Sequence, residues 1–248
     1  MRRRFFVDEF RDRAAVLEGD TALHLGRVLR AEPGQLYELS DGSEVWLARV
    51  EEVARGRVDF SLVEQLPQTA PGPQVTLLLA VVKFDRFEWC LEKATELGVA
   101  GIVPLAAARS DAGLLAAAGK RAKRWQRILV ESAQQSRRLA PPALHEVAEP
   151  TAAFRKYAAK DSAALFFSER GDAPSLRSIL EPRRTASSVV VAIGPEGGWT
   201  DAEIAAAETA GYLAASLGPL VLRTESAVIS ALAAINYALG DSQPPAVG

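Results

Sequence analysis

The sequence predicts an α/β protein in two parts: a small β-barrel or β-sandwich, then a larger part built on a mostly parallel sheet. Short β-rich runs with turn signals fill the first 65 residues. A polar stretch with three prolines and one glycine, at residues 67–73, should not continue any helix or strand. After it, apolar strand-like runs alternate with helical runs, which is the pattern of a parallel α/β sheet. We therefore place a linker near residue 70.

The expected elements follow in chain order. In the first part, runs at 35–39 and 44–50 flank a hairpin signal, and 57–63 supplies another strand. In the second part we expect strands at 75–82, 99–105, 163–168, 187–193 and 212–217, and helices at 85–97, 120–138, 174–181, 201–210 and 225–239. Residues 243–248 should fray.

Composition and charge are those of an ordinary folded protein. The 248 residues are 48% hydrophobic and 24% charged, which is enough for a substantial core. A formal net charge of −2 excludes a uniformly basic nucleic-acid-binding surface but leaves room for local basic patches. No segment has the length and apolarity of a membrane span, and no apolar signal core follows the basic start. We therefore expect a cytoplasmic protein without a membrane partner.

Cysteine and histidine usage excludes two kinds of site. Cys90 is the only cysteine, so no intramolecular disulfide can form. With only His24 and His145, the chain cannot assemble a Cys/His zinc cluster, and we expect no metal. Cys90 falls on the apolar side of an expected helix, which favours a buried, inert thiol over a nucleophile.

The segment 189–203 is the strongest candidate for a ligand site. A β-branched run ends in Gly194-Pro195-Glu196-Gly197-Gly198 and leads into a helix, and α/β proteins bind ligands at such strand ends. The glycines permit positive φ and close backbone approach to a ligand. Thr200 and Glu203 have capping-box spacing. The alternative is a tight strand-to-helix turn with nothing bound. Both common nucleotide-binding loops are missing from the chain, so the segment must be judged with its surroundings.

Two other strand ends bear charges. Lys83 and Arg86 could bind an anionic substrate, or could be solvated on a first helical turn whose expected N-cap is Asp85. Arg223 lies in a loop before an expected helix, with Thr224 as N-cap and Glu225 favouring the positive helix start. Helix capping does not explain Arg223, so we favour a substrate role for it.

The expected helix at 120–138 has seven basic residues and a single acid, Glu131. Such a density is a candidate phosphate-binding face. Trp125 could stack on a base or anchor the helix to the core, and its spacing favours the core.

Five segments, taken in order, resemble one family. They are residues 24–30, 83–86, 93–99, 194–198 and 222–227, with the sequences HLGRVLR, KFDR, KATELGV, GPEGG and LRTESA. Over nearly its whole length the chain is similar to the bacterial small-subunit ribosomal RNA uridine N3-methyltransferases.

The resemblance implies a PUA-like RNA-binding β-barrel domain over residues 1–70. It also implies a SPOUT-class methyltransferase domain over residues 74–241, whose C-terminal part forms a deep trefoil knot. The residues alone would suggest an open doubly wound sheet, because true knots are rare. The resemblance further implies a homodimer that uses S-adenosylmethionine to methylate N3 of one uridine in the decoding region of 16S ribosomal RNA, within the 30S subunit.

On matching positions, the resemblance implies a cofactor pocket made by two loops. Its residues would be Ile193, Gly194, Glu196, Gly197 and Gly198 from the first loop, and Leu217, Gly218, Leu222 and Arg223 from the second. The chain departs from the family pattern in several places: Phe84 and Arg137 stand for glycines, Gln134 for a glutamate, and Ser226 for a threonine. The change at Ser226 keeps the hydroxyl group.

The implied chemistry needs a base and a cation, because uridine N3 bears an imide proton whose loss leaves negative charge on the uracil. We expect Arg223, with Arg86, to stabilise that charge, and Glu225 or Asp85 to accept the proton. The target base must be flipped or unpaired, since N3 lies on its Watson–Crick edge.

We expect basic residues from both parts of the chain to contact RNA phosphates. These are Arg27, Arg30, Lys83, Arg121, Arg124 and Arg138. The arginines at 2–4 would add to them or form a solvated terminus. Two other functions stay open: a ribose 2′-O-methyltransferase of the same class, and a non-catalytic RNA-binding protein of ribosome assembly.

Overall fold

The computed structural model describes residues 3–68, 72–158, 162–168 and 173–240. The chain forms two compact units: Met1–Ala70 with Ala133–Pro141, and Pro71–Ser132 with Pro142–Gly248. The expected domain limits at 70 and 241, the expected fraying end and Arg2 lie outside the described residues. No helix among the described residues is long and apolar enough to cross a membrane.

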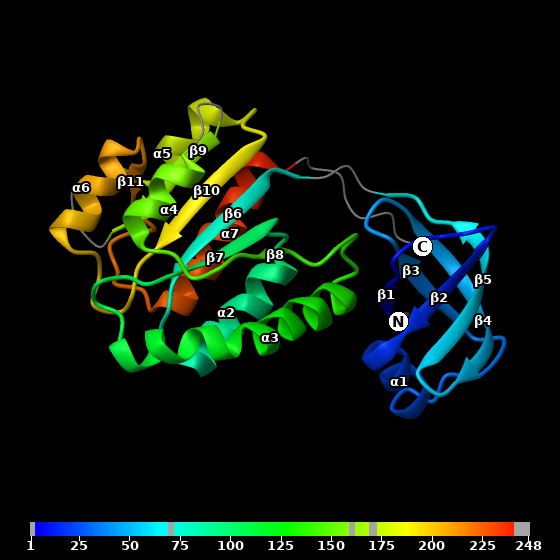
Figure 1. Ribbon diagram of the computed structural model, residues 1–248. Coiled ribbons are helices and arrows are strands. Elements are labelled where there is room, and N and C mark those ends of the chain that lie inside the picture. Colours follow the sequence, from blue (N-terminus) through cyan, green and yellow to red (C-terminus); the bar gives the residue numbers. More distant parts are fainter. Residues whose placement is uncertain (1–2, 69–71, 159–161, 169–172, 241–248) are drawn as a thin grey trace. The chain divides into compact units, whose positions relative to one another are not determined.

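The first unit is a curled five-stranded sheet with one helix (Figure 1). Its elements are β1 (Arg4–Phe6), β2 (Ala14–Glu18), α1 (Gly19–Arg27), β3 (Leu36–Ser40), β4 (Val45–Ala54) and β5 (Arg57–Gln65), in the sheet order β1-β3-β4-β5-β2. β1 is parallel to β3 and the other pairs are antiparallel. Two register shifts in the β4–β5 pair, of the kind that bulges produce, increase the local twist. The predicted hairpin at 35–50 is confirmed.

The segment Ala133–Pro141 belongs to this first unit through polar contacts. Arg4 donates to the carboxylate of Glu38 at 3.0 Å and to the carbonyl of Arg137 at 2.5 Å. Ser40 Oγ donates to the carbonyl of Leu139 at 2.6 Å. Glu38 is 6% exposed and also lies 3.6 Å from the guanidinium of Arg137. Arg4 is therefore a structural residue of the unit and not a free terminal cation.

The second unit contains a six-stranded, fully parallel sheet in the order β11-β9-β10-β6-β7-β8. Its strands are β6 (Gln74–Ala80), β7 (Gly101–Leu105), β8 (Ala143–Leu144), β9 (Ser162–Phe167), β10 (Ser188–Ile193) and β11 (Leu213–Ala215). Its helices are α2 (Phe84–Glu96), α3 (Ala112–Gln135), α4 (Pro150–Tyr157), α5 (Leu176–Leu180), α6 (Asp201–Thr209) and α7 (Thr224–Leu239), with a short 3-10 turn η1 (Glu181–Arg183). The predicted parallel α/β sheet is confirmed.

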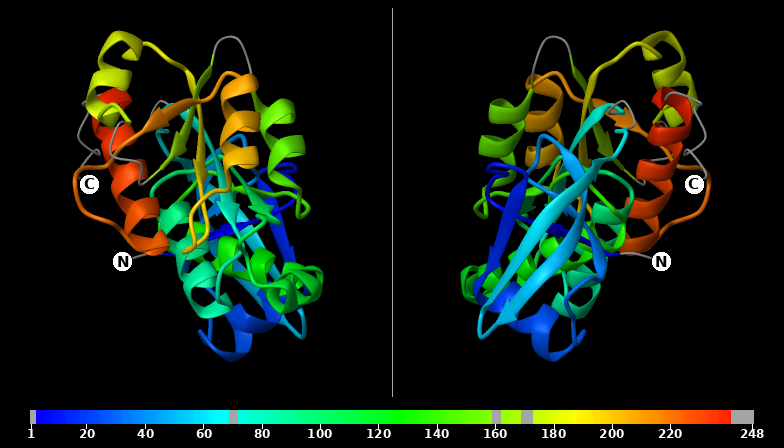
Figure 2. Two further views of the ribbon diagram at one scale, coloured as in Figure 1. Left: turned by 90° about the vertical axis from the view of Figure 1, so that its left-hand side faces the viewer. Right: turned by 90° about the vertical axis from the view of Figure 1, so that its right-hand side faces the viewer.

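Both faces of this sheet are buried. Alternate strand residues such as Leu77 and Leu165 pack with α2, α3, α5 and α7, whereas Leu78 and Phe166 pack with α4 and α6. Figure 2 shows α4 and α6 on one side of the sheet and α5 and α7 on the other. Burial on both faces explains why β10 reads as a continuous apolar run.

Several element predictions need correction. β1, β2, β8, α4 and the short turn η1 escaped prediction, and of α1 only a helical turn around His24 and Arg27 was expected. α3 begins at Ala112, eight residues before the predicted start, because Leu114 and Leu115 pack on the core despite nearby glycines. It ends at Gln135, and Arg137 has a φ of 55°, so Arg137 and Arg138 lie outside the helix.

Two predicted N-caps are also wrong. α2 begins at Phe84 with Lys83 in the cap position, so Asp85 lies inside the first turn. α7 begins at Thr224 with Arg223 in the cap position. Neither cap residue forms a side-chain cap hydrogen bond. By contrast, the predicted capping box of Thr200 and Glu203 is present at the start of α6.

Candidate functional site

The carboxyl ends of β9, β10 and β11 surround a cavity of about 910 Å³. The three strands are neighbours in a parallel sheet, so their carboxyl ends lie at one edge. Two segments supply most of the wall: the glycine loop, residues 194–199, and the apolar loop, residues 216–223. A cavity of this volume is in the range that binds a small-molecule cofactor.

The glycine loop is fixed from beneath by Trp199. This indole is 7% exposed, and its Nε1 donates to the carbonyl of Phe167, at the end of β9, at 3.0 Å. A side chain at Gly194 would place its Cβ 2.9 Å from the Trp199 ring, closer than carbon atoms can approach. Gly198 has a φ of 69° and donates its N–H to the carbonyl of Pro195 at 2.8 Å. Glycine is thus required at Gly194 by close packing and at Gly198 by backbone conformation.

The end of the glycine loop is fixed by the capping box of α6. The hydroxyl of Thr200 accepts from the N–H of Glu203, and Glu203 Oε2 accepts from the Thr200 N–H at 2.8 Å. The other oxygen of Glu203 accepts from the N–H of Ala108 at 2.9 Å. Glu203 is 7% exposed, and both of its oxygens have donors.

The apolar loop is held by fewer bonds. Leu220 and Val221 are each 79% exposed. Gly218 has a φ of 122° and donates its N–H to the hydroxyl of Ser216. Arg223 is exposed, lines the cavity, and forms no ion pair with any residue that the structure describes. A cation without an ionic partner at a cavity wall is available for a ligand or substrate.

Arg86 lies between two carboxylates. It forms ion pairs with Glu196 of the glycine loop and with Glu225 of the first turn of α7, the latter with Nε and Oε1 3.5 Å apart. Oε2 of Glu225 is buried and has no hydrogen-bond partner among the described residues. Asp85 is exposed and makes no polar contact with the described part of the chain. Of the two candidate proton acceptors, the structure brings only Glu225 into contact with Arg86.

The structure brings together nearly all residues predicted to bind the cofactor. Eight of the nine line the cavity: Ile193, Gly194, Glu196, Gly198, Leu217, Gly218, Leu222 and Arg223. Gly197 does not line it, but its carbonyl accepts from Nη1 of Arg109 at 2.7 Å. Arg109 lines the cavity and escaped prediction, although its place just beyond the carboxyl end of β7 was a usable signal.

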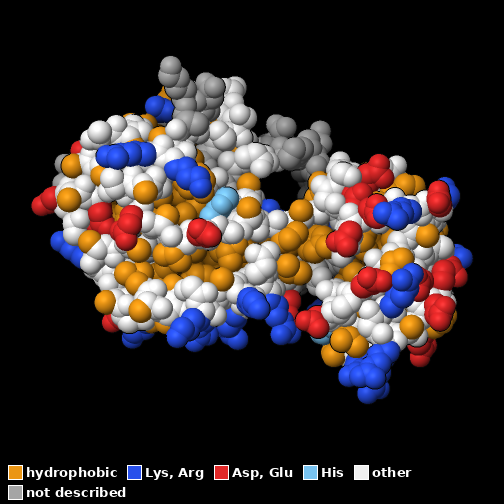
Figure 3. Space-filling view, in the orientation of Figure 1, with side chains coloured by type: hydrophobic (Ala, Val, Ile, Leu, Met, Phe, Trp, Pro, Cys, Tyr) orange, Lys and Arg blue, Asp and Glu red, His pale blue; other side chains and the backbone are white. Residues whose placement is uncertain are grey.

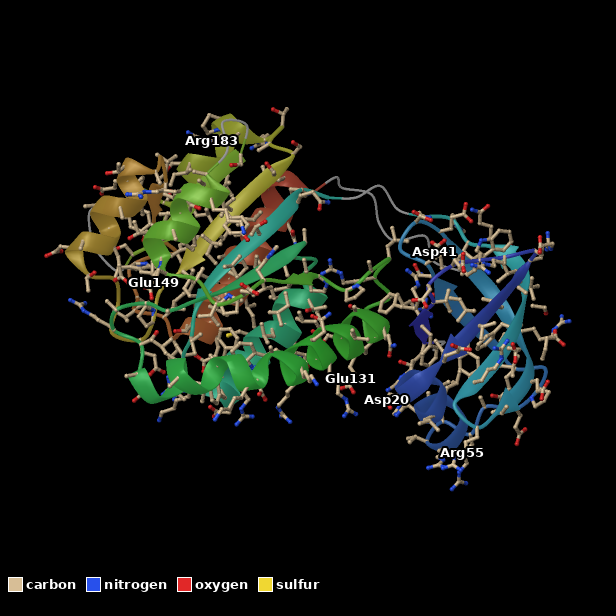
Figure 4. The ribbon with its side chains drawn as sticks, in the orientation of Figure 1. Asp20, Asp41, Arg55, Glu131, Glu149 and Arg183 are labelled. Atoms are coloured by element: carbon tan, nitrogen blue, oxygen red, sulfur yellow. The ribbon has the colours of Figure 1, made fainter. Side chains whose placement is uncertain are left out.

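The predicted RNA-contacting residues are distributed over both units. Arg121 and Arg124 of α3 both pair with Glu88 of α2, at 3.4 and 2.8 Å. Basic side chains gather along α3 (Figure 3), and Glu131 projects from the same helix (Figure 4) and pairs with Arg127 at 2.8 Å. The basic face predicted for this helix is therefore partly neutralised by acidic neighbours.

The other predicted RNA contacts have different environments. Lys83 is exposed at the cap position of α2, and Arg27 and Arg30 are exposed in the first unit. Arg138 also belongs to the first unit, where burial lowers the pKa of its guanidinium. Trp125 is 1% exposed, so its side chain anchors the core. A side chain this buried is not accessible to a base, so Trp125 has the core role that its spacing favoured.

Cys90 is fully buried, as predicted. Burial, and then the nearby carboxylate of Glu225, raises the pKa of its thiol to about 12. A thiol in this state is not a nucleophile at neutral pH.

Comparison with protein families identifies an RNA methyltransferase domain over residues 69–236. A ribosomal RNA small subunit methyltransferase E of Synechocystis is 36% identical over 221 residues, which cover 87% of this chain and 70% of that one. The enzyme of the same name from Mycobacterium tuberculosis is 34% identical over 93% of this chain and 90% of its own.

Solved structures of methyltransferases also match this chain. A crystal structure of ribosomal RNA small subunit methyltransferase E from Neisseria gonorrhoeae, bound to S-adenosylmethionine, matches with a TM-score of 0.86 and 29% identity, covering 98% of this chain and 100% of that one. A Legionella pneumophila protein, also in complex with this cofactor, matches with a TM-score of 0.85 and 29% identity, covering 96% and 98% of the two chains.

Proposed function

The chain belongs to the RNA methyltransferase family that includes ribosomal RNA small subunit methyltransferase E, and from this premise we propose that it methylates N3 of one uridine in the decoding region of 16S ribosomal RNA. S-adenosylmethionine is the methyl donor. The cavity between the glycine loop and the apolar loop is the observation on which the proposal depends most.

The residues around this cavity fit the cofactor. S-adenosylmethionine is an adenosine joined to an amino acid through a positive sulfonium, so it needs both apolar walls and polar groups. Leu217, Leu222 and Ile193 provide apolar surface, and the backbone of the glycine loop provides donors and acceptors. The missing side chain of Gly194 leaves room for the Trp199 ring, and its backbone lines the cavity. When bound, the cofactor supplies an activated methyl group, and no metal is needed.

The residues beside the cavity can prepare the uridine, which is the methyl acceptor, for methylation. Arg223 has no ionic partner in the described chain, so its charge is free to stabilise the negative uracil carbonyl that forms when N3 loses its proton. Arg86 is already paired with two carboxylates, so it orients Glu196 and Glu225 and shares the developing charge less directly. Oε2 of Glu225, which has no donor among the residues that the structure describes, is the proposed proton acceptor, directly or through water.

We propose that the RNA is held by cations of both units. The exposed Arg27 and Arg30 act from the first unit, with the partly buried Arg138, and Lys83, Arg121 and Arg124 act from the second. Contacts of this type set register on the phosphate backbone, while the flipped uridine enters the cavity. Because Glu88 already pairs with Arg121 and Arg124, phosphates must compete with it for these two residues.

The proposal has further parts. Residues 1–70 form a PUA-like RNA-binding domain, and residues 74–241 form a methyltransferase domain with the predicted knot. The protein acts as a homodimer in the cytoplasm, at the ribosome. Support for the dimer comes from apolar surface on the second unit. Leu220 and Val221 are 79% exposed, and Tyr237 on α7 is 93% exposed. Leu220 and Val221 are adjacent in the chain, and contiguous exposed apolar surface is typical of interaction sites.

The test is methylation of 30S subunits that lack the modification, with labelled S-adenosylmethionine and mapping of the methylated atom. The proposal expects the label on uridine N3, and expects Arg223→Ala to lower single-turnover methylation at least tenfold while cofactor affinity changes little. Arg223→Lys should restore part of the rate, and Arg177→Ala, an exposed arginine of α5, is the matched control. Label on a ribose oxygen would instead indicate the 2′-O-methyltransferase. Subunit binding without any transfer would indicate the assembly protein.

A further inference from the structure

The segment that follows β7 belongs to neither cavity loop, yet it forms hydrogen bonds with the glycine loop and with the start of α6. It runs from Ala106 to Asp111, beyond the carboxyl end of β7. It meets the 194–203 segment at two points, the N–H of Ala108 on Glu203 Oε1 at 2.9 Å and the guanidinium of Arg109 on the carbonyl of Gly197 at 2.7 Å. The first bond holds the post-β7 segment to the start of α6, and the second extends from it to the middle of the glycine loop.

Arg109 contacts Gly197 with its stem as well as with its charge. A Cβ built on Gly197 would lie 3.3 Å from Arg109 Cβ and 3.4 Å from Arg109 Cδ, so the aliphatic stem lies directly against this glycine. The guanidinium then donates to the carbonyl of the same residue.

The two ends of the glycine loop are held by other groups. Trp199 fixes Gly194 from the sheet side, and the capping box fixes Thr200. Between them, the turn Pro195–Gly198 contains two glycines and closes on itself through one backbone hydrogen bond, from Gly198 to Pro195. Glycines lose the most conformational freedom on ordering, so this turn is the part of the wall that most needs an external contact.

We propose that Arg109 is a positioning residue that orders the Pro195–Gly198 turn before S-adenosylmethionine binds. The cavity wall is thereby formed in advance, and the cofactor does not spend binding free energy on ordering it. The inference rests on the proposed function for the identity of the ligand, but the ordering of the turn is a property of the protein alone. Glu196 lies inside this turn, so Arg109 also fixes the carboxylate that pairs with Arg86.

The first test needs no ligand. Amide hydrogen exchange over residues 194–200 is compared in the wild-type protein, in Arg109→Met, which keeps an unbranched stem but loses the donor, and in Arg177→Met as control. We expect exchange at Gly198 to rise about three- to tenfold in Arg109→Met, with unchanged exchange over 216–223 and an unchanged melting temperature. Equal exchange at Gly198 in all three proteins would overturn the inference.

The second test measures cofactor binding by calorimetry and transfer rates on 30S subunits. Arg109→Met should weaken S-adenosylmethionine binding about three- to tenfold, while kcat at saturating cofactor stays within about twofold of wild type. Arg109→Lys, which keeps a donor on a flexible stem, should recover part of the affinity. A fall in kcat without a change in affinity would instead place Arg109 in the chemistry and overturn the positioning role. If the wild-type protein bound no cofactor, the proposed function would fail while the exchange result would still decide the inference.

Discussion

The glycine loop and the apolar loop face the same cavity but are held in opposite ways. Four side chains from outside the glycine loop's turn hold it: Trp199 beneath Gly194, Arg109 on Gly197, Arg86 paired with Glu196, and Glu203 at the start of α6. Residues 219–222 of the apolar loop form no hydrogen bond with any described residue. Leu220 and Val221 instead present most of their surface to solvent.

The difference separates the wall that the chain completes alone from the surface that the proposed homodimer would cover. The shape of the glycine loop is determined by packing and by contacts with side chains of the same unit, so this wall exists in the isolated unit. The apolar loop exposes side chains that gain free energy only when covered. We therefore expect substitutions in the first loop to change stability and cofactor binding, and substitutions in the second to change association.

Gly194→Ala should have the largest effect. Its methyl group would lie 2.9 Å from the Trp199 ring, and the ring cannot move without breaking its bond to Phe167. Overpacking of this type costs about 1–3 kcal/mol, and we expect the melting temperature to fall by about 2–10 °C. Cofactor affinity, measured by calorimetry, should fall at least tenfold. Gly119→Ala on α3, where nothing lies within 4 Å, is the control and should be neutral or slightly stabilising.

Trp199→Phe should have a smaller effect on the same wall. The phenyl ring keeps most of the packing under Gly194 but removes the donor to the buried carbonyl of Phe167. An unsatisfied buried acceptor costs about 1–3 kcal/mol, part of which repacking will recover. We therefore expect the free energy of unfolding, measured in urea, to fall by about 1–2 kcal/mol. A neutral result would show that packing alone, without this hydrogen bond, holds the glycine loop.

The double variant Leu220→Ser, Val221→Ser should affect association with little change in folding stability. Both side chains are 79% exposed, and surface substitutions of this type usually change stability by less than about 0.5 kcal/mol. Sedimentation should show a dimer in the wild-type protein and a larger monomer fraction in the variant. Val28→Ser, 64% exposed in the first unit, is the control. Unchanged sedimentation would remove the apolar loop from the dimer interface.

Cys90 should show almost no reaction with an alkylating agent in the native protein. Its reactivity tests whether the apolar loop, which forms few hydrogen bonds, opens the neighbouring core. Cys90 lies near Glu225, at the start of α7 where this loop ends, and burial with the Glu225 charge raises the pKa of its thiol to about 12. At pH 8 the thiol is therefore protonated and inaccessible, and iodoacetamide should modify it only after denaturation. Rapid modification of the native protein would show that the first turn of α7 opens together with the loop.

The sequence predicted those parts whose signals are local. The β-branched run of β10, the glycines after it and the spacing of Thr200 and Glu203 were sufficient for the strand, the turn and the capping box. The parallel sheet followed from the alternation of elements. Contacts between distant segments left no such signal, so Arg109, which approaches Gly197 from the end of β7, escaped prediction.

The missed elements have physical reasons of the same kind. α1 contains glycines at Gly19 and Gly26 and lacks a side-chain N-cap, so its helical propensity is weak and its buried Leu25 holds it in place. β1 has three residues and depends on pairing with β3. These short elements form because of tertiary contacts, which periodicity does not report.

Two departures from the family pattern, Phe84 and Arg137, form contacts that the structure describes. Phe84 packs edge-on against Trp125, with ring centroids 6.1 Å apart, and the guanidinium of Arg121 lies 4.6 Å from its ring. Arg137 adopts a φ of 55°, a conformation that favours glycine, and its side chain approaches Glu38. Gln134 is 9% exposed, and nothing in its surroundings explains why it replaces a glutamate.

The place of β10 in the sheet determines when the second unit can close during synthesis. β10 pairs with both β6 and β9, yet β6 ends at Ala80 and β10 begins at Ser188. At ordinary elongation rates of about 5–20 residues per second, the edge of β6 waits roughly 5–20 s for its neighbour to be translated. An apolar strand edge left open for that time is prone to pair with another chain. The nascent protein is thus most vulnerable to aggregation before its central strand leaves the ribosome, and its yield in cells should depend on chaperones that cover this edge.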